Sequence, residues 1–442
     1  MRPEELERIV PGWRAYRSDR RFGGSTGVLL RTCAVGIDTV FLVAWRSDDA
    51  DSTGSIELVA DGWHRTRSID LRTSHKLSWS EGRCVVDTED DWVWLAVHTT
   101  VTTVAAADYE PVPLLPDRDI PPARARFPVI DVHAHLSLTD APVEERIALM
   151  DEVGVQIVVD APFTERGETT ADTVERFVRQ RPDRFVPASA IDLSRVRDSD
   201  GVHALADQLR TDVREHGVVM VGEIHDKGFG VDDSGIGPLL EDPLFIDDRR
   251  LDPLWECLST LQLPISVHIG EAHHTYSLPS PSHDNLRRLL HSPWTRPRPG
   301  GLTHGDVHDQ RDRVLERFPR LTMISAHLDN DGEDLAKLAD RLRRHPNPFL
   351  DIGQRHRTLA RQPRRAADFL NAFHGRVLYG GDRSQGRADY LEQFRVLETD
   401  HDSFLPADRL DWWPLYGLAL PDPVLEAIYA GTARRLLPRL PE

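Results

Sequence analysis

From residue 129 onward, short apolar segments alternate with stretches in which apolar residues recur at helical spacing. QIVVDA and LPISVHIG are two of the apolar segments, and VEERIALMDEVG and GEDLAKLADRLRRH are two of the helical stretches. A repeated strand and helix is typical of a parallel sheet, and eight repeats favour a (β/α)8 TIM barrel. We therefore predict an α/β fold of this kind, with an open doubly wound sheet as the alternative. The eight predicted strands are residues 129–136, 156–161, 184–192, 217–224, 263–270, 321–328, 348–353 and 376–382.

Residues 24–105 follow a different pattern, with short runs of Val, Ile, Thr and Trp separated by turn residues. This pattern predicts a small all-β sandwich or jelly-roll domain over residues 1–110. Six prolines then disfavour regular structure over residues 111–128, which we interpret as a linker before a barrel domain at 129–442. Six of the ten tryptophans lie in the β domain. They fill its core in the simpler interpretation, and stack on sugar rings in the alternative.

The charge balance limits the kinds of partner. The 72 acidic and 54 basic residues give a net charge of −18, which repels phosphate backbones and anionic lipids. We therefore expect a small-molecule substrate and neither nucleic acid nor membrane as partner, and a homo-oligomer stays open. Three scattered cysteines, a charged N-terminal segment and the lack of a long apolar run favour a cytoplasmic location.

Polar residues end five of the predicted barrel strands. His133 and His135 lie two apart in IDVHAHL, so the period of a strand sends both side chains to one face. Four other strands end in the same way, at Glu223, His268, His327 and Asp382. The carboxyl ends of barrel strands carry catalytic residues, and several buried imidazoles and carboxylates need a cation to be stable together. The sequence predicts one or two divalent ions, most simply zinc, with manganese, iron or nickel as alternatives.

This ordered set of motifs resembles the amidohydrolase superfamily. Within it, residues 128–438 are most similar to the amidohydrolase-related (amidohydrolase 2) branch, which also contains decarboxylases of the aminocarboxymuconate-semialdehyde type. GEIHDKGFG, FIDDRRLDPLWE and LPISVHIGE resemble predicted metal-dependent hydrolases of that branch. The resemblance implies that His133, His135 and His268 are metal ligands. It makes Asp382 a ligand or a proton-transferring carboxylate, and His327 a second ligand or a hydrogen-bond donor to the substrate.

Glu223 departs from the decarboxylase-like pattern, in which a lysine is more usual at this position. A glutamate here bridges two metals in one interpretation, which favours hydrolysis. In the other interpretation it forms a salt bridge that holds His225 or Lys227. His225 is two residues from Glu223 on the same strand face, so both side chains reach the same site.

The predicted reaction is hydrolysis of an amide, lactone or ester by a metal-activated water, with Asp382 transferring the proton. Metal-dependent, non-oxidative decarboxylation is the alternative, because the barrel and its ligands do not separate the two reactions. A non-enzymatic binding protein is the third hypothesis. We expect substrate contacts from His225, from His273 in the long segment 271–301, and from Arg355 after the seventh strand. Asp329 either orients His327 or caps the next helix.

Overall fold

We describe the 442-residue chain from a computed structural model. The structure describes the backbone of the strands between Arg14 and Thr100, and residues 115–442 with gaps. The gaps are residues 116, 118, 165–166, 197–198, 232–239, 277–282, 284, 287, 289–300, 383–385 and 407–412. The chain divides into two units, Met1–Asp108 and Tyr109–Glu442, and each is considered by itself.

The strands of the first unit pair antiparallel. Their order in the main sheet is β1-β2-β4-β8-β7, with β3 beside β4, and β5 pairs with β6 separately. The predicted sandwich packing and the predicted roles of the tryptophans concern side chains of this unit, which lie outside the described part of the chain. The bounds are β1 Arg14–Phe22, β2 Ser25–Arg31, β3 Ala34–Val35, β4 Asp38–Arg46, β5 Ser55–Glu57, β6 Thr66–Ser68, β7 Val85–Glu89 and β8 Trp92–Thr100.

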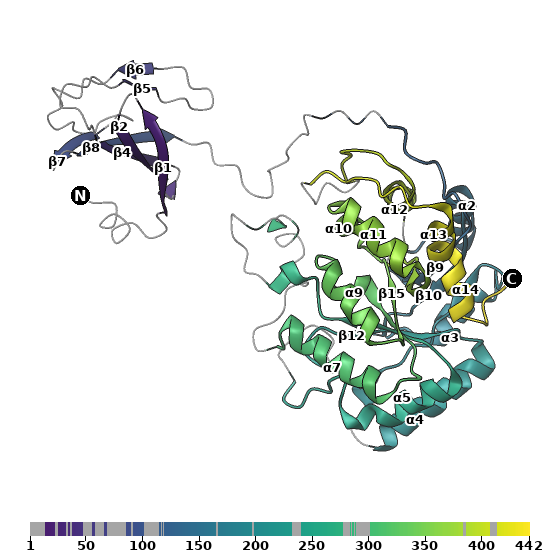
Figure 1. Cartoon of the computed structure of the whole chain (residues 1–442). Helices are drawn as coiled ribbons and strands as arrows, with labels where there is room; N and C mark the ends of the chain where they lie inside the picture. The colour runs from purple at the N-terminus through teal and green to yellow at the C-terminus, as the bar shows by residue number, and fades with distance from the viewer. Residues whose placement is uncertain are drawn as a thin grey trace. The chain divides into compact units, whose positions relative to one another are not determined.

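The second unit contains parallel strands surrounded by helices, which confirms the predicted α/β fold (Figure 1). Each of the eight predicted segments contains a strand or overlaps one, although most strands are shorter than predicted. Their bounds are β9 Val129–Ala134, β10 Val155–Asp160, β11 Phe185–Pro187, β12 Val221–Asp226, β13 Ile265–Ile269, β14 Met323–Ser325, β15 Pro348–Asp351 and β16 Val377–Leu378.

Backbone hydrogen bonds close these strands into a barrel. Two parallel sheets, β11-β10-β9 and β12-β13-β14-β15-β16, meet at a bridge between Ser189 and Val221. At the other junction, Val132 of β9 donates its N–H to the carbonyl of Tyr379 after β16, at 3.1 Å. The buried Asp131 carboxylate accepts the N–H of Gly381 at 2.9 Å across the same junction. Because the strands are parallel, the carboxyl ends of all of them lie at the same end of the barrel, which we call the mouth.

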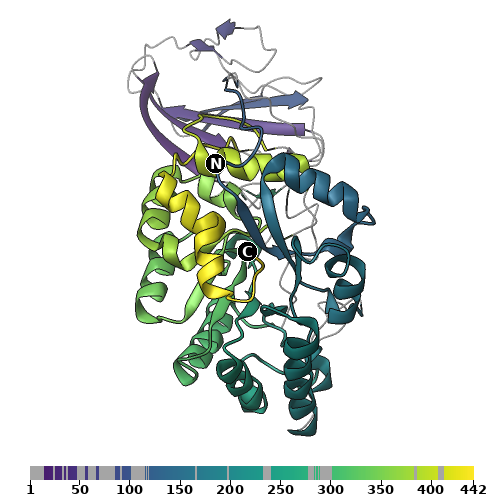
Figure 2. The ribbon, with the colours of Figure 1, turned by 90° about the vertical axis from the view of Figure 1, so that its right-hand side faces the viewer.

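Helices pack around the barrel with their apolar faces inward. In α9, Leu335, Leu338, Ala339 and Leu342 recur at helical spacing and are all buried. The C-terminal helices lie beside the first barrel strands in Figure 2. They also contact the last strand, because Tyr379, directly after β16, donates its backbone N–H to the carbonyl of Ile428 at 2.9 Å.

The longer helices are α2 Val143–Val153, α4 Ser199–Thr211, α5 Asp252–Leu261, α7 His304–Arg317, α9 Leu335–Arg344, α11 Pro363–Phe373 and α12 Arg387–Glu398. The shorter ones are η1 Leu136–Leu138, α3 Thr170–Thr173, η3 Val174–Val178, η4 Leu193–Arg195, η5 Asp212–His216, η6 Arg249–Leu251, η7 His273–Tyr276, α8 Ala326–Asp329, α10 His356–Ala360, η9 His374–Arg376, α13 Asp422–Glu426, η10 Ala427–Gly431 and α14 Thr432–Leu436. None of the helices in the described part of the chain has the length and apolar character needed to cross a membrane.

Candidate metal centre

His133 and His135, at the end of β9, each hold one ring nitrogen against a hydrogen-bond acceptor and leave the other toward the barrel mouth. His133 Nδ1 lies 3.0 Å from the carboxylate of Asp351, and His135 Nδ1 lies 2.6 Å from the carbonyl oxygen of Ala161. Because both partners are acceptors, each Nδ1 carries the hydrogen. The Nε2 atoms are therefore the ones free to bind a cation.

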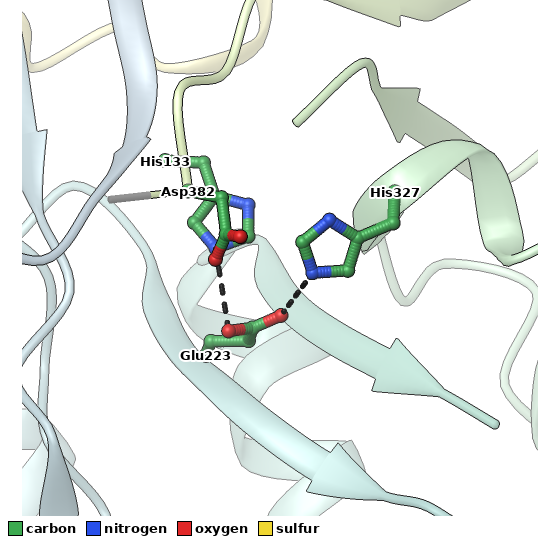
Figure 3. Close-up of side chains that lie close together, drawn as sticks. All are labelled: His133, Glu223, His327 and Asp382. Atoms are coloured by element: carbon green, nitrogen blue, oxygen red, sulfur yellow. Dashed lines mark hydrogen bonds and ion pairs between the residues drawn. The ribbon is translucent and has the colours of Figure 1, made fainter. Parts of the chain in front are cut away.

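Glu223 on β12 is the centre of the cluster. Its Oε2 lies 3.3 Å from Nε2 of His133 and 3.3 Å from Nε2 of His135. Its Oε1 lies 3.4 Å from Nε2 of His327 and 3.2 Å from Nδ1 of His268. Figure 3 shows His133 and His327 both directed at this carboxylate. Nε2 of His225 is a further neighbour, 3.2 Å from Oε2.

Asp382 follows β16 and completes the cluster from the last strand of the barrel. Its backbone N–H donates to the carbonyl of His133 at 2.6 Å, and its Oδ1 lies 3.6 Å from Nε2 of the same residue. The side chain is 21% exposed, more than any histidine of the cluster, so it faces the open mouth. Burial opposes ionisation, but the charges of His327 and His133 lower the pKa of Asp382.

His327 lies in an unusual backbone segment. β14 ends at Ser325, and His327, Leu328, Asp329 and Asn330 then have φ of 59°, 52°, 59° and 50°. Four successive left-handed residues without glycine are costly, at about 1–2 kcal/mol each. The turn points Nδ1 of His327 at the carbonyl of Gly353, at 2.8 Å, and Nε2 at Glu223.

Buried charges hold this turn in place. Arg311 and Arg341 both pair with the Asp329 carboxylate, and the side-chain amide of Asn330 donates to the carbonyl of Ile269 at 3.0 Å. Burial opposes ionisation of Asp329, but Arg311 and His308 lower its pKa. Asp329 therefore neither orients the imidazole of His327 nor caps the next helix. The residue that caps α9 is Asp334.

Asp351, the last residue of β15, was not predicted as part of the site. Its Oδ2 accepts from His133 Nδ1, and its Oδ1 accepts from the backbone N–H of His327 at 3.1 Å. One buried carboxylate thus fixes a ring on β9 and the start of the turn after β14. Its position at a strand end, the signal that singled out Asp382, was present in PFLDIG.

The cluster is suited to a cation. Burial disfavours a charged His133, but Glu223 and Asp351 raise the pKa of His133 well above its ordinary value. These carboxylates therefore favour a positive charge beside the ring, which either a proton on Nε2 or a metal ion in its place supplies. Burial likewise opposes ionisation of Glu223, and His133 and His225 lower its pKa well below the ordinary range. Imidazole nitrogens and carboxylate oxygens that converge in this way match the ligands of zinc and of manganese, iron or nickel. Two groups share Glu223: His133, Glu223, His327 and Asp382 form one, and Glu223, His225 and His268 form the other.

A third group of possible ligands, His304, His308 and Asp331, has a different character. Both ring nitrogens of His308 lie 2.7 Å from backbone carbonyl oxygens, so neither offers a free lone pair. Asp331 pairs with Lys337 and Arg341. We interpret this group as part of the ion network that supports the left-handed turn.

The predicted substrate contacts differ in position. His225 lies in the cluster with a side chain that is 17% exposed. Arg355 is half-buried and donates to the side-chain oxygen of Asn330 and to the carbonyl of Gln354. His273 is exposed, and its ring packs against His304 rather than a residue of the cluster. Most of segment 277–300 lies outside the described residues, and so does the segment 232–239 after β12.

The fold and this cluster together define a parallel α/β barrel with a candidate metal centre at the carboxyl ends of its strands. The chain matches the Amidohydrolase family over residues 130–439 and belongs to it, which confirms the resemblance seen in the sequence.

Three solved structures are similar at low sequence identity. An uncharacterised TIM-barrel protein from Bordetella bronchiseptica has 18% identity and a TM-score of 0.46, over 72% of this chain and 100% of that one. A Staphylococcus aureus protein assigned as an amidohydrolase has 16% identity and a TM-score of 0.43, over 71% of this chain and 100% of that one. The apo form of IDCase from Metarhizium anisopliae has 14% identity and a TM-score of 0.40, over 68% of this chain and 79% of that one. Among curated proteins, none matches the chain.

Proposed function

We propose that the protein is a metal-dependent hydrolase that cleaves an amide, lactone or ester bond of a small molecule. Membership of the Amidohydrolase family supports the class of reaction. The observation that carries the proposal is the position of Glu223, whose two carboxylate oxygens face separate histidines. A carboxylate placed in this way suits two divalent ions that share it, and zinc is the simplest choice for these ligands.

When bound, the ions supply a water of lowered pKa and a positive charge beside the carbonyl oxygen of the substrate. In this proposal His133, His135 and His268 are ligands. His327 is a ligand as well, because its Nδ1 donates to a carbonyl and leaves Nε2 without a hydrogen in the neutral ring. Asp351 and the carbonyl of Ala161 keep the rings on β9 in the binding orientation.

Asp382 is the proposed proton-transfer residue. An aspartate carboxyl is ionised at neutral pH, and the side chain of Asp382 is 21% exposed at the mouth. It therefore accepts a proton from the attacking water and returns it to the leaving group. His225 and Arg355 are the proposed substrate contacts at the mouth, and a contact from His273 stays a prediction.

The test is turnover of a panel of lactones, esters, amides and aromatic carboxylates by protein whose metal content has been measured. We expect hydrolysis of at least one of the first three classes. Asp382→Asn should reduce kcat by about 100-fold or more, because the amide cannot accept the proton. Asp368→Asn, on the exposed face of α11, is the matched control and should retain full activity.

Two results would contradict the proposal. Release of CO₂ from the carboxylates without hydrolysis of the other compounds would assign the alternative decarboxylase reaction. Full activity of the Asp382→Asn protein would remove the proposed role of that residue.

A further inference from the structure

Lys227 lies directly after β12, the strand that carries two residues of the metal centre. Because side chains alternate along a strand, Glu223, His225 and Lys227 share one face. Asp226, between His225 and Lys227, is directed to the other face. Its carboxylate accepts the backbone N–H groups of Gly228 and Ile246 at 3.1 and 3.2 Å. The strand therefore carries Lys227 to the same mouth as the candidate ligands.

Glu271 fixes the position of the lysine ammonium. Nζ of Lys227 lies 2.6 Å from Oε1 of Glu271, and the Glu271 side chain is 8% exposed. The same Oε1 lies 3.7 Å from Nε2 of His268, whose Nδ1 faces Glu223. Lys227 is thus separated from a proposed metal ligand by one carboxylate.

The ammonium is charged and accessible. Burial would lower the pKa of Lys227, but Glu271, with further contributions from Glu223 and Asp382, raises it. The side chain is 30% exposed, and the contact with one oxygen engages only one of the three N–H donors of an ammonium. The remaining donors are able to bind a group that enters from the mouth.

The charges at the mouth favour an anion. With two divalent ions bound, the five positive charges of the ions and Lys227 would exceed the four negative charges of Glu223, Asp382, Glu271 and Asp351. A second cation, Arg355, is anchored through Asn330, whose amide donates to the carbonyl of Gly270 at 3.2 Å beside Glu271. An anionic substrate group removes the repulsion that a lysine next to bound cations would otherwise produce.

We propose that Lys227, positioned by Glu271, binds an anionic group of the substrate, most simply a carboxylate. This inference rests on the proposed hydrolase function and narrows it to small carbonyl compounds that carry a free carboxylate. Lys227 is then a specificity-determining residue, and Glu271 is the residue that positions it.

The first test compares each carboxylate-bearing substrate with its neutral amide counterpart. Lys227→Met should lower kcat/KM for the carboxylate by about tenfold or more and change that for the neutral compound by less than about threefold. Lys227→Arg should restore part of the preference, because it keeps the charge. Arg179→Met is the matched control: it removes an exposed cation that pairs with Glu175 outside the metal centre and outside the ion network of the turn, and should leave both values unchanged. Equal losses for both compounds would overturn the inference.

The second test does not depend on turnover, so it separates this inference from the proposed function. Succinate and neutral succinamide are titrated calorimetrically into the protein incubated with Zn²⁺. We expect succinate to bind at least about tenfold more tightly, and the preference to vanish in Lys227→Met but not in Arg179→Met. Equal binding of both compounds by the unmodified protein, or a preference that survives in Lys227→Met, would overturn the inference. If no compound of the panel is hydrolysed, the hydrolase proposal fails while this comparison still decides the role of Lys227.

Discussion

At the residue scale, the candidate site depends on how the far side of each imidazole is held. Asp351 fixes His133, the Ala161 carbonyl fixes His135, and the Gly353 carbonyl fixes His327. Each contact settles which nitrogen carries the hydrogen and directs the other one at Glu223. Metal affinity should therefore depend on residues that touch no ion.

Asp351→Asn tests this dependence. The amide removes the charge that stabilises His133 and can turn its NH₂ group toward Nδ1, so the ring loses its fixed orientation. We expect metal affinity to fall about 10- to 100-fold, as measured by competition with a chromogenic chelator. A variant that folds, by circular dichroism, and keeps the affinity of the unmodified protein would show that Asp351 has no positioning role.

Glu223→Gln tests whether one carboxylate serves two ions. The amide keeps the size of the side chain but loses the charge and one acceptor oxygen, so at most one ion should remain bound. Elemental analysis should give about two ions per chain before the substitution and one or none after it. Retention of two ions by Glu223→Gln would contradict the shared-carboxylate arrangement.

At the element scale, the turn after β14 is maintained by charges from two helices. Arg311 of α7 and Arg341 of α9 pair with Asp329, and α9 begins five residues after the turn ends. The helices thus stabilise a backbone conformation that its own residues disfavour.

Asp329→Asn should be strongly destabilising, because it leaves two buried guanidinium groups without a full counter-charge. We expect the free energy of unfolding to fall by about 3–5 kcal/mol, measured by denaturant titration. Asp309→Asn, on the exposed side of α7, should change it by less than about 0.5 kcal/mol. Similar values for the two variants would mean that the ion network does not support the turn.

The contact between α10 and α12 should depend on pH. Burial opposes ionisation of Glu392, but a hydrogen bond from His356 and the charges of His356 and Arg357 lower its pKa to about 2. A carboxylate with a lowered pKa stabilises the fold above its unfolded pKa of about 4.5, and this stability is lost as the pH falls toward 2. Glu392→Gln should therefore reduce the Tm at pH 7, by an amount that shrinks as the pH approaches 2. A Tm difference that is constant with pH would contradict this assignment.

The sequence predicted the strands and most of the cluster because both depend on local patterns. Alternation and strand ends are visible in VIDVHAHL and VGEIH without knowledge of the fold. The left-handed turn was not predictable, since AHLDN contains no glycine and its partners Arg311 and Arg341 lie on other elements. The arginine-rich pattern of residues 341–344 is typical of a solvated helix face, yet Arg341 is buried and pairs with Asp329.

At the scale of the whole molecule, the segment before the barrel makes polar contacts with the rest of the second unit. Asp117 pairs with Arg395 of α12, and Arg126 donates its backbone N–H to Glu398 at 2.9 Å and pairs with Asp422. The division after Asp108 leaves these contacts within the second unit.

Truncation should reveal this boundary. A protein of residues 109–442 should keep metal binding and a Tm close to that of the full chain. A protein of residues 129–442 should melt several degrees lower, because it lacks the contacts with α12. Differential scanning calorimetry on both measures the effect, and equal Tm values would show that residues 109–128 act only as a connection.

The hydrogen-bonded junction between β9 and β16 has a consequence for the chain during its translation. His133 and Asp382 are linked through the backbone at this junction, although 248 residues separate them in the sequence. While the chain is emerging from the ribosome, its early histidines lack the later strands, which carry His268, His327 and Asp382 of the cluster. Under the proposed function, we therefore expect high-affinity loading with metal to wait until translation has passed the final barrel strand.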